Sequence, residues 1–203
     1  MSSKSIKYYS MVRSLLAISA ALVLTSCAHA ITIDPGPSQT SYQNKLSPKK
    51  VGYVITDTDK NKQVISAGGG GDKVSYYPYR DIERPIREAL KSIYTDVYAI
   101  ASISEVDKIK KDEVTIIFTP VISTTSNSSS ILTWPPTDFT INFNCTVVDA
   151  AGTPITNFTL TGIGQSQFSE FSAARDGGLS GRRAAGDLSE KLRQEILKSP
   201  ALQ

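Results

Sequence analysis

The chain is poor in the residues that most catalytic and metal sites use. A single histidine, His29, and two cysteines, Cys27 and Cys145, occur in 203 residues. Ser-His-Asp and Cys-His systems and histidine-based zinc sites need a histidine held in a folded region, whereas His29 lies in a polar N-terminal stretch. The acids fall at expected helix starts and in polar connections, so no pair is predicted to face across a cleft. We therefore expect no enzyme activity, no metal site and no cofactor.

Long apolar runs are equally scarce, and the only one covers residues 14–26. It follows a positively charged segment and ends in Leu24-Thr25-Ser26-Cys27, which is the layout of a bacterial lipobox. The run is shorter than the roughly 20 residues that a transmembrane helix needs. An ordinary secretory signal cut after Ala28-His29-Ala30 is the competing interpretation. The lipobox predicts that residues 1–26 are a cleaved signal peptide and that Cys27 carries lipid.

Cleavage before Cys27 would also remove the excess of positive charge. The precursor has 22 Lys and Arg against 19 Asp and Glu. Lys4, Lys7 and Arg13 leave with the signal and no acid does, so 19 cations face 19 acids in the mature chain. Binding to polyphosphate requires a basic surface, and we therefore expect no nucleic-acid partner.

The chain after Cys27 divides into a polar stretch and one domain. Residues 27–50 are rich in Ser, Thr, Gln, Asn and Pro without apolar periodicity, which predicts a lipidated flexible tether. Residues 51–203 are long enough for a single folded domain with its own core. Cys145 lies among alternating apolar residues of a predicted strand, so we interpret it as a buried structural thiol.

The pattern of the domain predicts an α+β fold, with a small mostly antiparallel sheet and two helices packed on one face. A helix is expected from Asp81, as its N-cap, to about Val97, and a second from about Ser180 to Ser199. The expected strands are 51–56, its candidate partner 63–66, 114–122, 138–149 and 155–165. The Ser/Thr/Asn run 123–130 is predicted to be a loop.

Trp134, Pro135 and Pro136 form the main surface candidate. This only tryptophan stands beside two stiffening prolines, and tryptophan is enriched in binding hot spots and at membrane interfaces. A contact with a partner or membrane and a structural role, in which Trp134 covers one end of the sheet, are equally supported. Tyr76, Tyr77 and Tyr79 form a second aromatic cluster and a candidate ligand contact, against the alternative that they pack between strand and helix.

Two glycine-rich segments superficially suggest anion sites. Residues 68–73 lack the Gly-Lys-Ser/Thr ending and are not followed by a helical pattern, so a hairpin loop is favoured over a phosphate loop. Residues 177–183 precede a helix and end in Arg182 and Arg183. A glycine-rich connection with two solvated arginines is favoured there over an anion site.

With the lipobox Leu24–Cys27, the polar stretch and this order of elements, the chain resembles the small envelope lipoproteins of Gram-negative bacteria, of the YajG type or the lipopolysaccharide-assembly type. The specific part of the resemblance is the lipobox, and Ala28 after the cysteine implies sorting to the outer membrane. The resemblance implies a non-catalytic accessory or assembly factor for an envelope complex, anchored through Cys27, facing the periplasm and binding an envelope protein partner. A periplasmic binding module for a glycan, lipid or other small ligand is the alternative.

Overall fold

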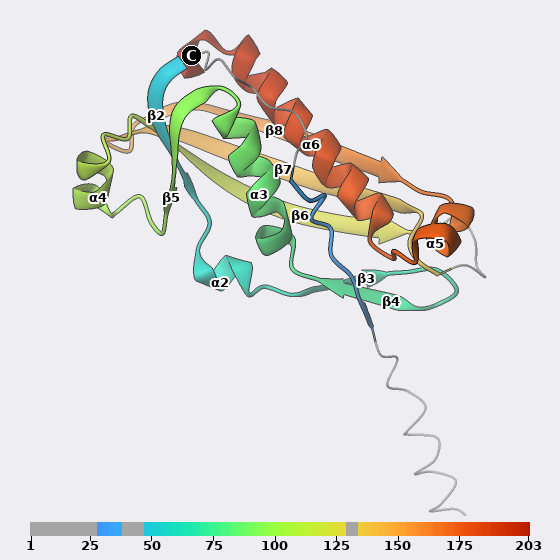
Figure 1. Cartoon of the computed structure of the whole chain (residues 1–203). Coiled ribbons are helices and arrows are strands. Elements are labelled where there is room, and N and C mark those ends of the chain that lie inside the picture. The colour runs from blue at the N-terminus through green and yellow to red at the C-terminus, as the bar shows by residue number, and fades with distance from the viewer. Residues whose placement is uncertain (1–27, 38–46, 129–133) are drawn as a thin grey trace, which may run out of the picture.

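The computed structural model describes residues 28–37, 47–128 and 134–203, which form an α+β domain (Figure 1). Residues 1–26, which are expected to be a signal peptide, and Cys27 lie outside these residues. A five-stranded sheet has the order β5-β2-β6-β7-β8 and a small sheet the order β1-β4-β3. The strands are β1 (His29–Ala30), β2 (Ser47–Val54), β3 (Val64–Ala67), β4 (Lys73–Tyr76), β5 (Tyr94–Ile100), β6 (Ile116–Asn127), β7 (Asp138–Asp149) and β8 (Pro154–Gln165). The helices are α2 (Asp57–Lys60), α3 (Pro78–Lys91), α4 (Val106–Lys111), α5 (Phe168–Ala174), α6 (Leu179–Lys198) and the 3-10 turn η1 (Pro200–Leu202).

The α+β class and the mostly antiparallel pairing are confirmed. β6, β7 and β8 pair antiparallel along almost their whole length, with Phe143 opposite Ile122 on one side and Leu160 on the other. β2 adds a short parallel part that the sequence did not predict, because it pairs parallel with both β5 and β6. No helix of the described residues is both long and apolar enough to cross a membrane.

Helix α6 confirms the expected C-terminal helix and lies very close to the sheet. Its apolar face, which includes Leu188 and Leu192, is buried. It contacts β7, β8 and α3 (Figure 1). A Cβ added at Gly164 of β8 would meet the Ser180 backbone oxygen at 2.0 Å. Glycine there lets the helix backbone approach the strand directly.

The predicted helix 81–97 was wrong at both ends. α3 begins at Pro78, where proline is favoured in the first turn, and ends at Lys91. The Ser92 hydroxyl donates to the Ala89 carbonyl at 2.6 Å just after the helix. Residues 94–100 then form β5 parallel to β2. Helical spacing in Ile93 and Val97 was misleading because the segment 94–100 is rich in residues that fit a strand.

Two predicted strand and loop boundaries also need correction. Residues 64–67 pair with β4 in the small sheet and not with the first strand. β6 continues through residues 123–127 of the predicted loop, paired to β7. Hydroxyl groups stabilise this polar strand end, because Thr124 Oγ1 lies 2.8 Å from the Tyr76 hydroxyl and Ser126 Oγ lies 2.7 Å from Ser66 Oγ. These bonds join β6 to the small sheet.

The predicted tether is wrong for residues 28–37 and 47–50. β1 pairs parallel with β4, and β2 already begins at Ser47. Ile33 is fully buried in the main core, and its backbone N–H donates to Asp81 Oδ2 at 3.0 Å. Asp34 accepts a hydrogen bond from Arg84 Nε at 3.0 Å. The apolar residues in this polar stretch are too few to show periodicity, yet one of them is a core residue.

Candidate interaction surface

Two glycines at the start of α6, Gly178 at its N-cap and Gly181 in its first turn, allow the N-terminal segment to pack closely against the helix. A Cβ added at Gly178 would meet the Thr32 backbone oxygen at 2.0 Å, and one added at Gly181 would meet Ile33 Cγ2 at 2.3 Å. Only a residue without a side chain permits this approach. The segment 177–183 that suggested an anion site therefore holds residues 32–33 against the domain.

The two arginines of that segment are engaged by carboxylates. Arg183 donates to both carboxylate oxygens of Glu170, at 2.6 and 3.0 Å, and these bonds lower the pKa of Glu170 to about 2. Arg182 pairs with Asp176. Glu170 and Arg183 belong to the wall of an open hollow of about 570 Å³ at the end of β7 and β8. A new anion would have to compete with these carboxylates, so the connecting role fits better than an anion site.

The packing alternative agrees with the positions of Tyr76 and Tyr79, because both side chains are buried. The Tyr76 hydroxyl bonds within the polar network to β6, and burial raises the pKa of Tyr76. The Tyr79 hydroxyl accepts a hydrogen bond from the Ile122 backbone N–H at 3.0 Å. Tyr77 is partly exposed, with the Arg80 guanidinium 3.9 Å above its ring. The cluster packs between strand and helix and offers no aromatic platform.

The position of Trp134 agrees with the structural role, in which its side chain covers one end of the sheet. Its ring lies 4.3 Å from that of His29 and 5.1 Å, edge to face, from that of Phe171. Its Nε1 is buried and has no hydrogen-bond partner among the described residues. Pro135 and Pro136 are buried, and the Pro136 carbonyl accepts from Ser180 Oγ at 2.8 Å. Trp134 therefore covers the junction of β1, α5 and the start of α6, and a protein partner cannot reach most of it.

Cys145 is 1% exposed on β7, and burial raises the pKa of its thiol to about 12. At neutral pH it is an un-ionised thiol, and a nucleophile must be a thiolate. The structural interpretation of Cys145 is confirmed.

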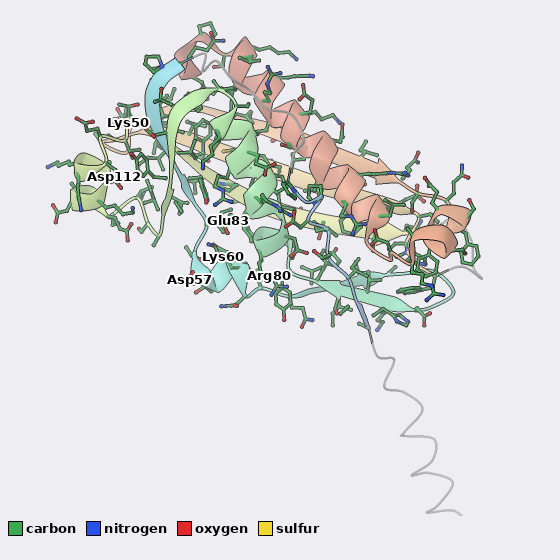
Figure 2. The ribbon with its side chains drawn as sticks, viewed as in Figure 1. Lys50, Asp57, Lys60, Arg80, Glu83 and Asp112 are labelled. Carbon is green, nitrogen blue, oxygen red and sulfur yellow. The ribbon has the colours of Figure 1, made fainter. Side chains whose placement is uncertain are left out.

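Glu83 and Asp112, two of the carboxylates predicted to lie at helix starts and connections, stand apart in the fold (Figure 2). Glu83 on α3 accepts from Lys60 Nζ and from the Tyr53 hydroxyl, each at 2.9 Å, and so links α2 and β2 to α3. Asp112 lies beyond α4, away from Glu83, and pairs with Lys108 at 3.1 Å. Within residues 28–37, 47–128 and 134–203, no group of three or more His, Cys, Asp or Glu could hold a metal ion.

The side of the β6-β7-β8 sheet that faces away from α6 carries a surface without a single charge. Twelve alternating positions in register make up this neutral face: Thr119, Val121, Ser123, Thr125, Thr140, Asn142, Asn144, Thr146, Asn157, Thr159, Thr161 and Ile163. All are exposed or partly exposed, with Val121 at 59% and Ile163 at 55%. Thr159 Oγ1 donates to Asn144 Oδ1 at 2.6 Å, which orders one of the cross-strand pairs.

Structured elements bound the neutral face at both ends. At one end a second apolar cluster that includes Ile109 of α4 and Val148 of β7 covers the sheet. At the other end Asp138 bonds to Gln165 Nε2 at 3.0 Å. Between them nothing in the described residues covers the twelve side chains. Sequence reasoning saw the alternation in 138–149 and 155–165 but did not assemble the polar positions into a surface.

The outer edge of β8 is closed where it passes α6. Three α6 side chains, Asp187, Lys191 and Arg183, bond to the backbone of Ile163, Thr161 and Gln165 at 2.8, 2.8 and 2.7 Å. An edge whose backbone groups are already bonded cannot add another strand there. The broad surface left for a partner is therefore the neutral face and not this part of the edge.

Comparison with known proteins gives only remote structural matches. No family model and no curated protein matches the chain. Among solved structures, protein XCC0632 from Xanthomonas campestris aligns with 11% identity over 85% of this chain and 97% of its own, with a TM-score of 0.46. A homologue of the neuraminyllactose-binding hemagglutinin from Helicobacter pylori aligns with 8% identity over 85% and 94%, TM-score 0.47. The PelC dodecamer subunit from Paraburkholderia phytofirmans aligns with 13% identity over 75% and 96%, TM-score 0.38. Likeness at this level carries no argument about function.

Proposed function

We propose that this chain is a non-catalytic envelope lipoprotein, held by lipid on Cys27 at the periplasmic side of the outer membrane. It acts as an accessory or assembly factor that binds a protein of an envelope complex through the neutral face. The lipobox at Leu24–Cys27 supports the anchor. The single observation that carries the binding role is the neutral face itself, with twelve uncovered positions and no charge.

An uncharged face suits burial against another protein. The cores of protein interfaces are depleted in charged residues, since each buried charge must be desolvated and paired. Hydroxyl and amide groups can exchange water for partner hydrogen bonds at little net cost. Val121 and Ile163 still expose more than half of their surface, so covering each contributes about 1 kcal/mol. The side chains of Tyr76 and Tyr79 are buried, and that of Trp134 packs against His29 and Phe171, so none of the three is assigned this role.

Support for a non-catalytic role comes from the state of the reactive groups. The Cys145 thiol is buried with a raised pKa. His29 stands in β1 of the small sheet with its Nε2 3.6 Å from Asp72 Oδ2, whereas Cys145 stands on β7 of the other sheet. Glu83 forms an ion pair with Lys60 and Glu170 forms one with Arg183, and each pair joins two helices. Asp112 forms an ion pair with Lys108, one turn earlier in the chain.

The test is to introduce a charged residue on the neutral face and to measure which proteins are recovered with the chain from membranes. We expect Val121→Asp and Ile163→Asp to lose a partner that wild type retains, because an unpaired carboxylate must be desolvated in the interface. Val106→Asp on α4 is the matched control, since Val106 is 48% exposed outside this face. Equal recovery with all three variants contradicts the assignment of the face. Retention of a neutral glycan by wild type, with loss in the same two variants, would instead support the alternative of a binding module.

A further inference from the structure

The site of lipid attachment stands one residue before a strand that is fixed to the domain. Ala28 follows Cys27 directly, and His29 and Ala30 pair with Val74 and Ser75 of β4. The Ile31 N–H donates to the Ser75 carbonyl at 3.0 Å, which extends this attachment by one residue. Buried Ile33 then fastens the segment into the core. Lipid on Cys27 would therefore hold the domain against the membrane with little freedom to turn.

A row of aromatic rings begins at His29 of β1. The ring of His29 lies 4.3 Å from that of Trp134, Trp134 lies 5.1 Å from Phe171, and Phe171 lies 6.0 Å from Phe168. Phe168 at the start of α5 is 50% exposed. We call these four side chains the aromatic rim. The rim begins two residues after Cys27, at His29, and ends in the exposed apolar ring of Phe168.

We infer that the aromatic rim is the surface that contacts the lipid bilayer, with Phe168 seated among the headgroups beside the acyl chains on Cys27. The inference rests on the proposed lipidation. Acyl chains that enter the bilayer bring Ala28 and His29 to its surface, and the rigid β1-β4 pairing brings the rim with them. Aromatic rings are favoured at the boundary between headgroups and hydrocarbon, and an apolar side chain beside a lipid anchor supplies a second attachment.

This contact would fix the direction in which the domain extends. In Figure 1, α4 lies at the opposite end of the five-stranded sheet from α5. With the rim on the membrane, the α4 end points into the periplasm. The neutral face would then stand at the side of the domain, open to a partner that lies next to it.

The test uses the lipidated full chain in phospholipid vesicles that contain brominated lipid, which quenches fluorophores at the bilayer. A fluorophore is attached at Phe168→Cys, with Val106→Cys as the matched control, because Val106 is 48% exposed on α4 at the opposite end of the sheet. Buried Cys145 does not compete for the label. We expect loss of fluorescence at position 168 and none at position 106. In unlabelled wild type, the only tryptophan, Trp134, should be quenched as well.

Mass spectrometry of the same sample separates two kinds of failure. Acyl groups on Cys27 together with equal quenching at both positions, or no quenching of wild-type Trp134, overturn the aromatic rim and leave the proposed anchor intact. A chain without acyl groups on Cys27 overturns the anchor, and the rim with it.

Discussion

Replacing Ile33 with alanine tests whether the N-terminal segment is part of the domain. A flexible tether would leave the Ile33 side chain exposed to solvent. In the structure it is 0% exposed, lies against Gly181 and belongs to the main core. The change removes three carbons, each worth about 0.8 kcal/mol when buried. A cavity adds to this, within the range of roughly 2–5 kcal/mol for such substitutions. We therefore expect Ile33→Ala to lower the free energy of unfolding by about 3 kcal/mol.

Urea denaturation of residues 28–203, followed by circular dichroism, measures this change. With a slope of about 2 kcal/mol per molar urea, the midpoint should fall by about 1.5 M. Ile163→Ala on the exposed neutral face is the control and should stay within about 0.5 kcal/mol of wild type. Removal of residues 28–37 should destabilise at least as much as Ile33→Ala, because it also leaves Asp81 Oδ2 without the Ile33 N–H. An Ile33→Ala midpoint equal to that of wild type would refute the packed segment.

Two further substitutions and one labelling experiment test the local chemistry. Tyr79→Phe should cost about 1–2 kcal/mol in urea denaturation, because the buried Ile122 N–H loses its acceptor, and an unchanged midpoint would contradict that bond. Burial raises the pKa of Asp81 in the folded chain, so its protonated form is favoured there. The stability of wild type relative to Asp81→Asn should be greatest below the unfolded pKa of about 4 and should fall as the pH rises through the folded pKa; the opposite slope would contradict this. Cys145 should resist iodoacetamide in the native chain and react in urea, as read by mass spectrometry, whereas rapid native labelling would show a reactive thiol.

The elements with long and regular patterns could be predicted from the sequence. β7 and β8 alternate over twelve residues each, and the buried stripe of α6 recurs at helical spacing. Segment 94–100 could not be separated from the preceding helix, because Ile93 and Val97 continue its spacing while pairing with β2 decides the outcome. Residues 28–37 pack through contacts with distant parts of the chain, among them Ile33 against Gly181 and Thr32 against Gly178, and no local pattern shows such a contact.

The neutral face could not be predicted from local sequence patterns either. The sequence suggested aromatic residues as the contact site, yet Tyr76, Tyr79 and Trp134 pack against other parts of the domain. The neutral face consists of ordinary Thr, Asn and Ser residues on three strands, and it becomes a surface only when the register aligns them. A Trp134→Ala variant would therefore disturb the packing of β1 and α5, and it is unsuitable as a test of partner binding.

Metabolic labelling with a palmitate analogue tests the central claim, the lipid anchor, most directly. The account predicts that the wild-type chain incorporates the label, fractionates with the outer membrane and loses both properties in Cys27→Ala. Incorporation of label by Cys27→Ala, or an unlabelled wild-type chain, would contradict it.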